Sequence, residues 1–81
     1  MVLSMSRTFY NESMKISARN QLRGTVETVD LGVVTAKVGV RVGENLIESV
    51  ITKQSVAELN IKMGSEVTAI IKSTEVMLMI D

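Results

Sequence analysis

An alternating run at residues 33–42 is the feature that most limits what this chain can fold into. The run reads VVTAKVGVRV, so every second residue is small and apolar, while Thr35, Lys37 and Arg41 fall between them. Successive side chains of a β-strand point to opposite faces, so the pattern predicts a strand with one face in a core. The residues GEN at 43–45 favour a hairpin loop, and residues 46–52 are expected to pair back.

The rest of the patterned sequence predicts three more strands and one short helix. Strands are expected over residues 22–29, which end at the turn signal DLG, and over residues 66–72 and 76–80. Residues 53–59 break the alternation and favour a short helix, with Thr52 as its N-cap. This order predicts an all-β fold, namely a five-stranded Greek-key barrel of the oligonucleotide/oligosaccharide-binding (OB) type with one short helix.

The length and composition favour a single domain that is stabilised by self-association. The chain has 81 residues and contains no cysteine and no histidine, which removes disulfides, ordinary zinc sites and imidazole catalysis. Residues 46–51 and 76–80 are apolar on both strand faces, whereas a small barrel has only one inside. We therefore expect the second face to meet another subunit, the alternative being simple exposure. Residues 1–14 show no period and are expected to form a flexible extension, with residues 15–81 as the domain.

Several classes of function are disfavoured by what the sequence lacks. The formal net charge is zero, and the only aromatic residues, Phe9 and Tyr10, fall in the N-terminal extension, where they either are free or pack on a neighbouring subunit. This argues against nucleic-acid binding, which relies on basic and aromatic surfaces. No apolar run approaches the roughly 20 residues that span a bilayer, so we expect a cytoplasmic protein without a membrane partner. No catalytic motif is present, so we do not expect an enzyme.

What remains is a set of hydrogen-bond donors at strand ends. Their residue types suit an anion, because hydroxyl, guanidinium and ammonium groups all donate. Each also has an ordinary structural interpretation, as a surface ion-pair partner, a turn residue, a helix cap or a solvated strand lysine. The residues alone leave both interpretations open for the following side chains: Ser17, Arg19, Thr52, Ser55, Lys72 and Ser73.

Three motifs in order resemble the Mop family, the small molybdate-binding proteins called molbindins. They are KISARNQLRG at residues 15–24, VITKQSV at 50–56 and MGSEVTAIIKSTEVM at 63–77. In this family the same module is also fused to molybdate-responsive regulators and to ATPases of molybdate importers. The resemblance runs from Lys15 to the C-terminus, and residues 1–14 lie outside it.

The resemblance implies a fold, an assembly and a ligand. The fold would be the five-stranded barrel, and the assembly a homohexamer, a trimer of dimers, with anion sites between subunits. The bound ligand would be molybdate or tungstate, with no catalytic cofactor, for cytoplasmic storage or buffering of molybdenum. The implied oxyanion-binding residues are Ser17, Ala18, Arg19, Asn20, Thr52, Ser55, Lys72 and Ser73.

The chemistry of molybdate agrees with such a donor set. Molybdate at neutral pH is a dianion without a proton, so donors and cations alone satisfy it. Phosphate is often protonated near pH 7, and an unpaired buried O–H costs about 1–3 kcal/mol. Sulfate is excluded only by size, and tungstate is expected to bind comparably to molybdate. The alternatives are an OB-type nucleic-acid or oligosaccharide-binding module and a carrier of the molybdopterin form of the cofactor.

Overall fold

A long first strand, β1 (Asn20–Leu31), organises the protein in the computed structural model, which describes residues 16–81. It is followed by β2 (Thr35–Val42) and β3 (Asn45–Thr52). The chain continues with helix α2 (Lys53–Glu58), strand β4 (Glu66–Ile71) and a 3₁₀ turn, η1 (Ser73–Glu75). The extension predicted at residues 1–14, and Lys15 with it, lies outside the described residues.

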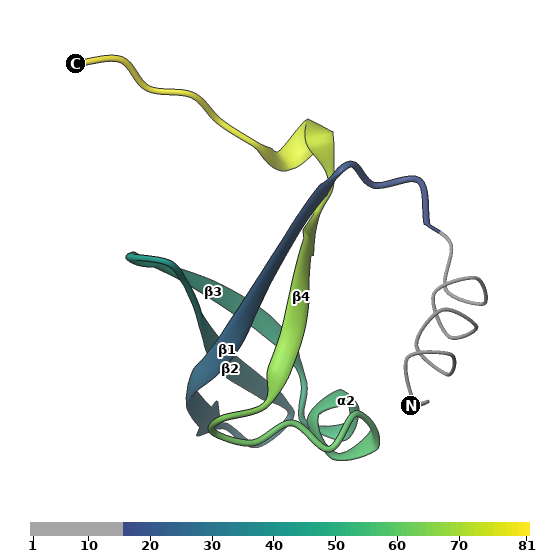
Figure 1. Cartoon of the computed structure of the whole chain (residues 1–81). Coiled ribbons are helices and arrows are strands. Elements are labelled where there is room, and N and C mark those ends of the chain that lie inside the picture. Colours follow the sequence, from purple (N-terminus) through teal and green to yellow (C-terminus); the bar gives the residue numbers. More distant parts are fainter. Residues whose placement is uncertain (1–15) are drawn as a thin grey trace, which may run out of the picture.

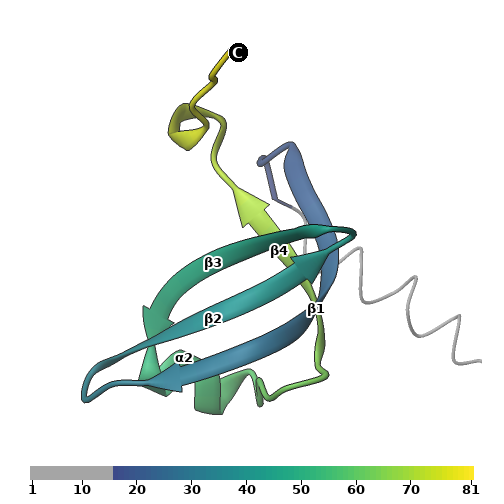
Figure 2. The ribbon, with the colours of Figure 1, turned by 90° about the vertical axis from the view of Figure 1, so that its left-hand side faces the viewer.

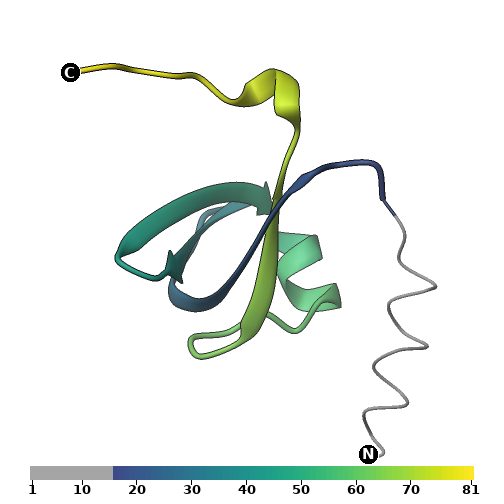
Figure 3. The same cartoon turned by 45° about the horizontal axis from the view of Figure 1, so that its top comes forward.

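The four strands form one antiparallel sheet in the order β3-β2-β1-β4 (Figure 1). The central strand β1 pairs with β4 through its first half, where Asn20 lies opposite Ile71, and with β2 through its second half. The register between β1 and β2 shifts between Val26 and Thr28, which marks a β-bulge. The sheet curls strongly (Figure 3), and within residues 16–81 its outer strands β3 and β4 are free edges.

The core confirms the alternation from which the fold was predicted. Ala36, Val38 and Val40 of β2 are at most 4% exposed and pack with Val26 and Val56. The predicted strand begins two residues late, because Gly32 N–H donates to the Thr35 carbonyl at 2.8 Å and closes a turn. Val33 and Val34 belong to that turn and are exposed.

Helix α2 forms where the break in alternation predicted it. Its N-cap is Thr52, whose hydroxyl oxygen accepts the Ser55 N–H at 3.0 Å. The helix is only six residues long and buries a single residue, Val56, against the strands. The chain leaves it through Asn60, whose φ of 55° is a left-handed conformation that asparagine tolerates better than most residues.

The prediction of a fifth strand over residues 76–80 is not confirmed within this chain. After η1 the segment Val76–Ile80 is extended but pairs with none of the four strands, and it leads away from the sheet (Figures 1 and 2). Its last four apolar side chains are each at least 90% exposed. A four-stranded sheet with two free edges is not a closed barrel. An apolar pattern predicts that a segment is buried, but it does not say against which chain.

Gly24 is required where β1 begins to pair with β2. A Cβ atom at this position would lie 2.5 Å from the Arg41 carbonyl oxygen and 2.8 Å from a Val40 methyl group. Because the first contact is with backbone, we expect Gly24→Ala to lower the free energy of unfolding by about 2–3 kcal/mol, measured by urea denaturation. The control is Gly43→Asn in the β2–β3 loop, which has open space and a φ of 61°. It should be nearly neutral, and equal losses in the two variants would contradict the packing argument.

Candidate oxyanion-binding site

One end of the sheet brings the first and last site motifs together. The segment before β1 carries Ser17, Ala18 and Arg19, and the segment after β4 carries Lys72 and Ser73. Because Asn20 lies opposite Ile71, the two segments leave the sheet side by side (Figure 1). Between them is an open hollow of about 420 Å³, lined by Ile16, Ser17, Ala18, Ile70, Lys72, Ser73 and Thr74.

The donors that line this hollow, and Arg19 next to it in the chain, are not used by the rest of residues 16–81. The side chains of Ser17, Arg19, Lys72 and Ser73 take part in none of the hydrogen bonds or ion pairs found among those residues. The lining contains no carboxylate. The lining thus offers one cation, Lys72, and hydroxyl groups that find no acceptor among residues 16–81, and Arg19 stands beside it at the start of β1 without lining it. Such donors suit an anion that carries no proton.

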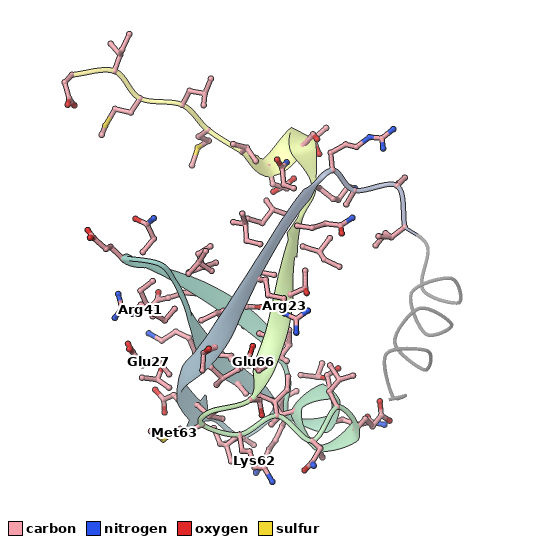
Figure 4. The ribbon with its side chains drawn as sticks, viewed as in Figure 1. Arg23, Glu27, Arg41, Lys62, Met63 and Glu66 are labelled. Atoms are coloured by element: carbon pink, nitrogen blue, oxygen red, sulfur yellow. The ribbon has the colours of Figure 1, made fainter. Side chains whose placement is uncertain are left out.

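Arg41 shows the contrasting case of a cation that is already paired. Its guanidinium donates to both carboxylate oxygens of Glu27, at 2.7 and 3.1 Å, on the outer face of β1 and β2 (Figure 4). This hydrogen bonding lowers the pKa of Glu27 and raises the pKa of Arg41. Lys37 likewise pairs with Glu48 at 3.8 Å. Arg41 and Lys37 are thus neutralised within the chain, whereas Arg19 and Lys72 have no ion pair among residues 16–81.

Asn20, one of the predicted site residues, makes a different bond in the structure. Its side-chain amide donates to the Ile71 carbonyl at 3.3 Å, and it does not line the hollow. It ties the start of β1 to the end of β4, immediately before Lys72. The neighbouring Gln21 donates to the Ala18 carbonyl at 2.7 Å, a contact that reasoning from donor types did not identify.

The predicted donors Thr52 and Ser55 lie at the opposite end of the sheet. Thr52 pairs with Thr35, beside the β1–β2 turn, and is thus separated from Asn20 by the length of β1. Figures 1 and 2 show α2 at one end and η1 at the other. Within one copy of the chain, therefore, these two hydroxyl groups do not join the other donors.

The hydroxyl pair of Thr52 and Ser55 nevertheless keeps a free donor. The two oxygen atoms are 2.8 Å apart, and the Ser55 N–H is bound by Thr52. One of the two hydroxyl protons lies in the bond between the oxygens, which leaves the second proton for an outside acceptor. The pair is exposed enough to meet one, since Thr52 is exposed and Ser55 half-buried.

Other kinds of site find no support in the described part of the chain. Residues 16–81 contain no group of three acidic, histidine or cysteine residues placed to hold a metal ion. None of the helices in this region has the length and apolar character needed to cross a membrane.

Comparison with known families gives one match that covers most of the chain. The model of the TOBE domain matches residues 16–78. Molybdenum-pterin-binding protein 1 of Clostridium pasteurianum is 52% identical over 82% of this chain and 98% of its own length. The chain therefore belongs to the TOBE-domain family, and within it to the Mop proteins, which are binding proteins and not a catalytic family.

Two solved structures share this fold. A molybdate-binding protein from Sporomusa ovata has a TM-score of 0.78 and 39% identity, over 82% of this chain and 98% of that one. The cytoplasmic molybdate-binding protein ModG, in a form with molybdate bound, has a TM-score of 0.72 and 41% identity, over 78% of this chain and 45% of that one. These likenesses confirm the resemblance that the three motifs indicated.

Proposed function

We propose that this protein binds molybdate or tungstate, as a cytoplasmic store or buffer of molybdenum and not as an enzyme. The observation that carries the proposal is the hollow between the start of β1 and the end of β4, where Lys72 and the serines at 17 and 73 have no acceptor among residues 16–81. Membership of the Mop proteins and the molybdate named for two structural relatives support the choice of anion.

The assembly that we propose begins with a pair of copies. The free edges β3 and β4 face a groove of about 280 Å³, whose walls are mostly apolar side chains from both edges, such as Ile47, Ile51 and Ile71. A strand placed there would close the sheet into the five-stranded barrel. The segment Val76–Ile80 has the required apolar character, but it leads away from the sheet of its own chain (Figure 1) and does not line this groove. We propose that each copy places this segment in the groove of its partner.

Such pairing also provides a physical reason for self-association. Four of the five side chains in the segment are at least 90% exposed, and burial of each is worth about 1.5–3 kcal/mol. A domain of this size buries only roughly 60% of the surface that its unfolded chain exposes, so association adds burial that the single chain lacks. Three pairs would then form the homohexamer that the family resemblance implies.

We further propose that the complete site is shared between copies. The donors near the hollow come from one end of the sheet, and the Thr52–Ser55 pair comes from the other end. A symmetric dimer places one end of each copy against the other end of its partner if the two chains run antiparallel. Ser17, Arg19, Lys72 and Ser73 of one copy would then meet the hydroxyl pair of its partner.

The test of this function is a calorimetric titration of the full chain with four anions at pH 7. Molybdate and tungstate should bind with similar affinity. Phosphate should bind roughly tenfold to hundredfold more weakly, because its O–H finds no carboxylate acceptor among the lining residues. Sulfate should fall below molybdate through its smaller size alone. The proposal fails if molybdate up to millimolar concentration gives no heat, or if phosphate binds as well as molybdate.

A second candidate ligand is the pterin form of the molybdenum cofactor, because the relative from Clostridium pasteurianum is named for it. A pterin would need contacts for its ring, and aromatic residues are absent from the whole of residues 16–81. The distinguishing measurement is fluorescence of the protein purified from cells. Pterin emission that co-elutes with the protein would favour this candidate, and its absence from a molybdate-loaded protein favours the free anion.

A further inference from the structure

We propose that Gln21 is a positioning residue for the oxyanion site, which fixes the orientation of the Ala18–Arg19 peptide. The inference rests on the proposed function and assigns it a residue that does not itself touch the anion. Gln21 is exposed and is not among the residues that line the hollow, whereas Ala18 is half-buried and lines it. Gln21 therefore acts on the site only through its hydrogen bond to Ala18.

The bond is short and its direction is determined by the chemistry of the two groups. The side-chain Nε2 of Gln21 donates to the Ala18 carbonyl oxygen at 2.7 Å. Because the peptide unit is planar and trans, the Arg19 N–H points away from the side on which that carbonyl lies. Holding the carbonyl at Gln21 thus determines which way the next N–H faces.

This orientation matters because the two ends of a peptide have opposite effects on an anion. A carbonyl oxygen carries partial negative charge and repels an oxyanion, whereas an N–H donates to it. The segment 16–19 precedes β1 and has no strand partner to fix its peptides. A peptide that is free to rotate would present its carbonyl for part of the time, and anion binding would have to reverse that rotation.

Asn20 supports the same segment from the other side of the strand. Consecutive residues of a strand point to opposite faces, and Asn20 uses its amide to bind the Ile71 carbonyl, at 3.3 Å, next to Lys72. The two side-chain amides hold neighbouring parts of the site from opposite faces of β1. Asn20 sets the distance between the two segments, and Gln21 sets the peptide orientation within one of them.

The test compares Gln21→Met with Thr25→Val in the full-length chain. Methionine has nearly the size of glutamine but cannot donate. Thr25 is exposed on the same strand, and its hydroxyl bonds to Glu66 at 3.3 Å, far along β1 from the hollow. Each substitution removes one hydrogen bond, but only the bond of Gln21 reaches a residue that lines the hollow. We therefore expect calorimetry to give a molybdate affinity roughly three- to tenfold weaker for Gln21→Met and unchanged for Thr25→Val.

A second readout separates positioning from general stability. In the anion-free protein, backbone order parameters at residues 17–19, from nitrogen-15 relaxation, should be lower in Gln21→Met, while the urea midpoint stays within error of the wild type. Gln21→Glu, which keeps the size but replaces the donor with a carboxylate, should weaken binding more than tenfold.

The possible outcomes separate this inference from the function on which it rests. If the wild type binds molybdate but Gln21→Met binds within twofold of it, the positioning role is wrong and the proposed function stands. If Gln21→Met and Thr25→Val weaken binding equally, the effect is not specific to the loop and the role is again wrong. If the wild type does not bind molybdate, the function and this inference both fall.

Discussion

Deletion of residues 76–81 is expected to convert the assembly into monomers and to abolish tight molybdate binding. The segment carries four side chains that are at least 90% exposed in the single chain, and we propose that they fill the partner's groove between β3 and β4. Their burial is worth roughly 6–12 kcal/mol per segment as an upper bound, which is of the order of a small domain's whole stability. The hydrophobic contribution to pairing would be lost with them.

Light scattering after size-exclusion chromatography measures the first effect, and calorimetry with molybdate measures the second. The matched control is a chain that lacks only Asp81, which removes a charge and leaves the apolar residues in place. A truncated chain that keeps the wild-type mass would contradict the exchange of this segment. A monomer that still binds molybdate tightly would contradict a site shared between copies.

Replacement of Arg19 by methionine is expected to weaken molybdate binding about tenfold to hundredfold. A hydrogen bond to a charged group is worth about 1.5–3 kcal/mol, and Arg19 has no internal ion pair among residues 16–81 that would hold it elsewhere. Methionine keeps most of the apolar stem, so packing changes little. Calorimetry at physiological ionic strength gives the affinity, because long-range attraction between separated charges is then screened.

Arg23→Met is the control for the loss of one positive charge. Arg23 is exposed and lies within β1, opposite Thr68 of β4 and away from the end of the sheet that carries Ser17 and Lys72 (Figure 4). Its replacement should change molybdate affinity less than twofold. If the two arginine variants lose equal affinity, the effect is one of net charge and Arg19 is not a ligand.

Much of the fold could be predicted from residue patterns because the patterns report local choices. The alternation in β2 predicts which side chains are buried, and Ala36, Val38 and Val40 are indeed in the core. The break in alternation before Val56 predicts the short helix and its Thr52 cap. Val34 was predicted to be buried with them but is exposed, because the turn closed by the Gly32 N–H takes it out of the strand.

The fifth strand shows why the remainder could not be predicted from the pattern. An apolar segment at residues 76–80 indicates burial, but pairing depends on the direction of the chain after η1, and there the chain leads away from the sheet (Figure 1). Residue periodicity contains no information about whether the partner strand belongs to the same copy.

The candidate site, like the fold, could be predicted only in part from the sequence. The hydroxyl and cationic residues were identified by type and by family resemblance, and the sheet register then places Ser17 beside Lys72 but Ser55 at the far end. Asn20 and Gln21 show the limit of reasoning from type. Both are amides in one motif, and only the structure shows that each holds a backbone carbonyl.

The most direct test of the shared site is a mixing experiment with two defective variants. Arg19→Met damages one end of the chain, and Thr52→Val combined with Ser55→Ala damages the other. The two variants are unfolded together in urea, refolded as an equal mixture, and titrated with molybdate. If each site takes donors from two copies, about a quarter of the sites in the mixture should combine two intact ends and bind with wild-type affinity. If no wild-type sites are recovered in a mixture that assembles normally, the site lies within a single copy and the proposal of a shared site is wrong.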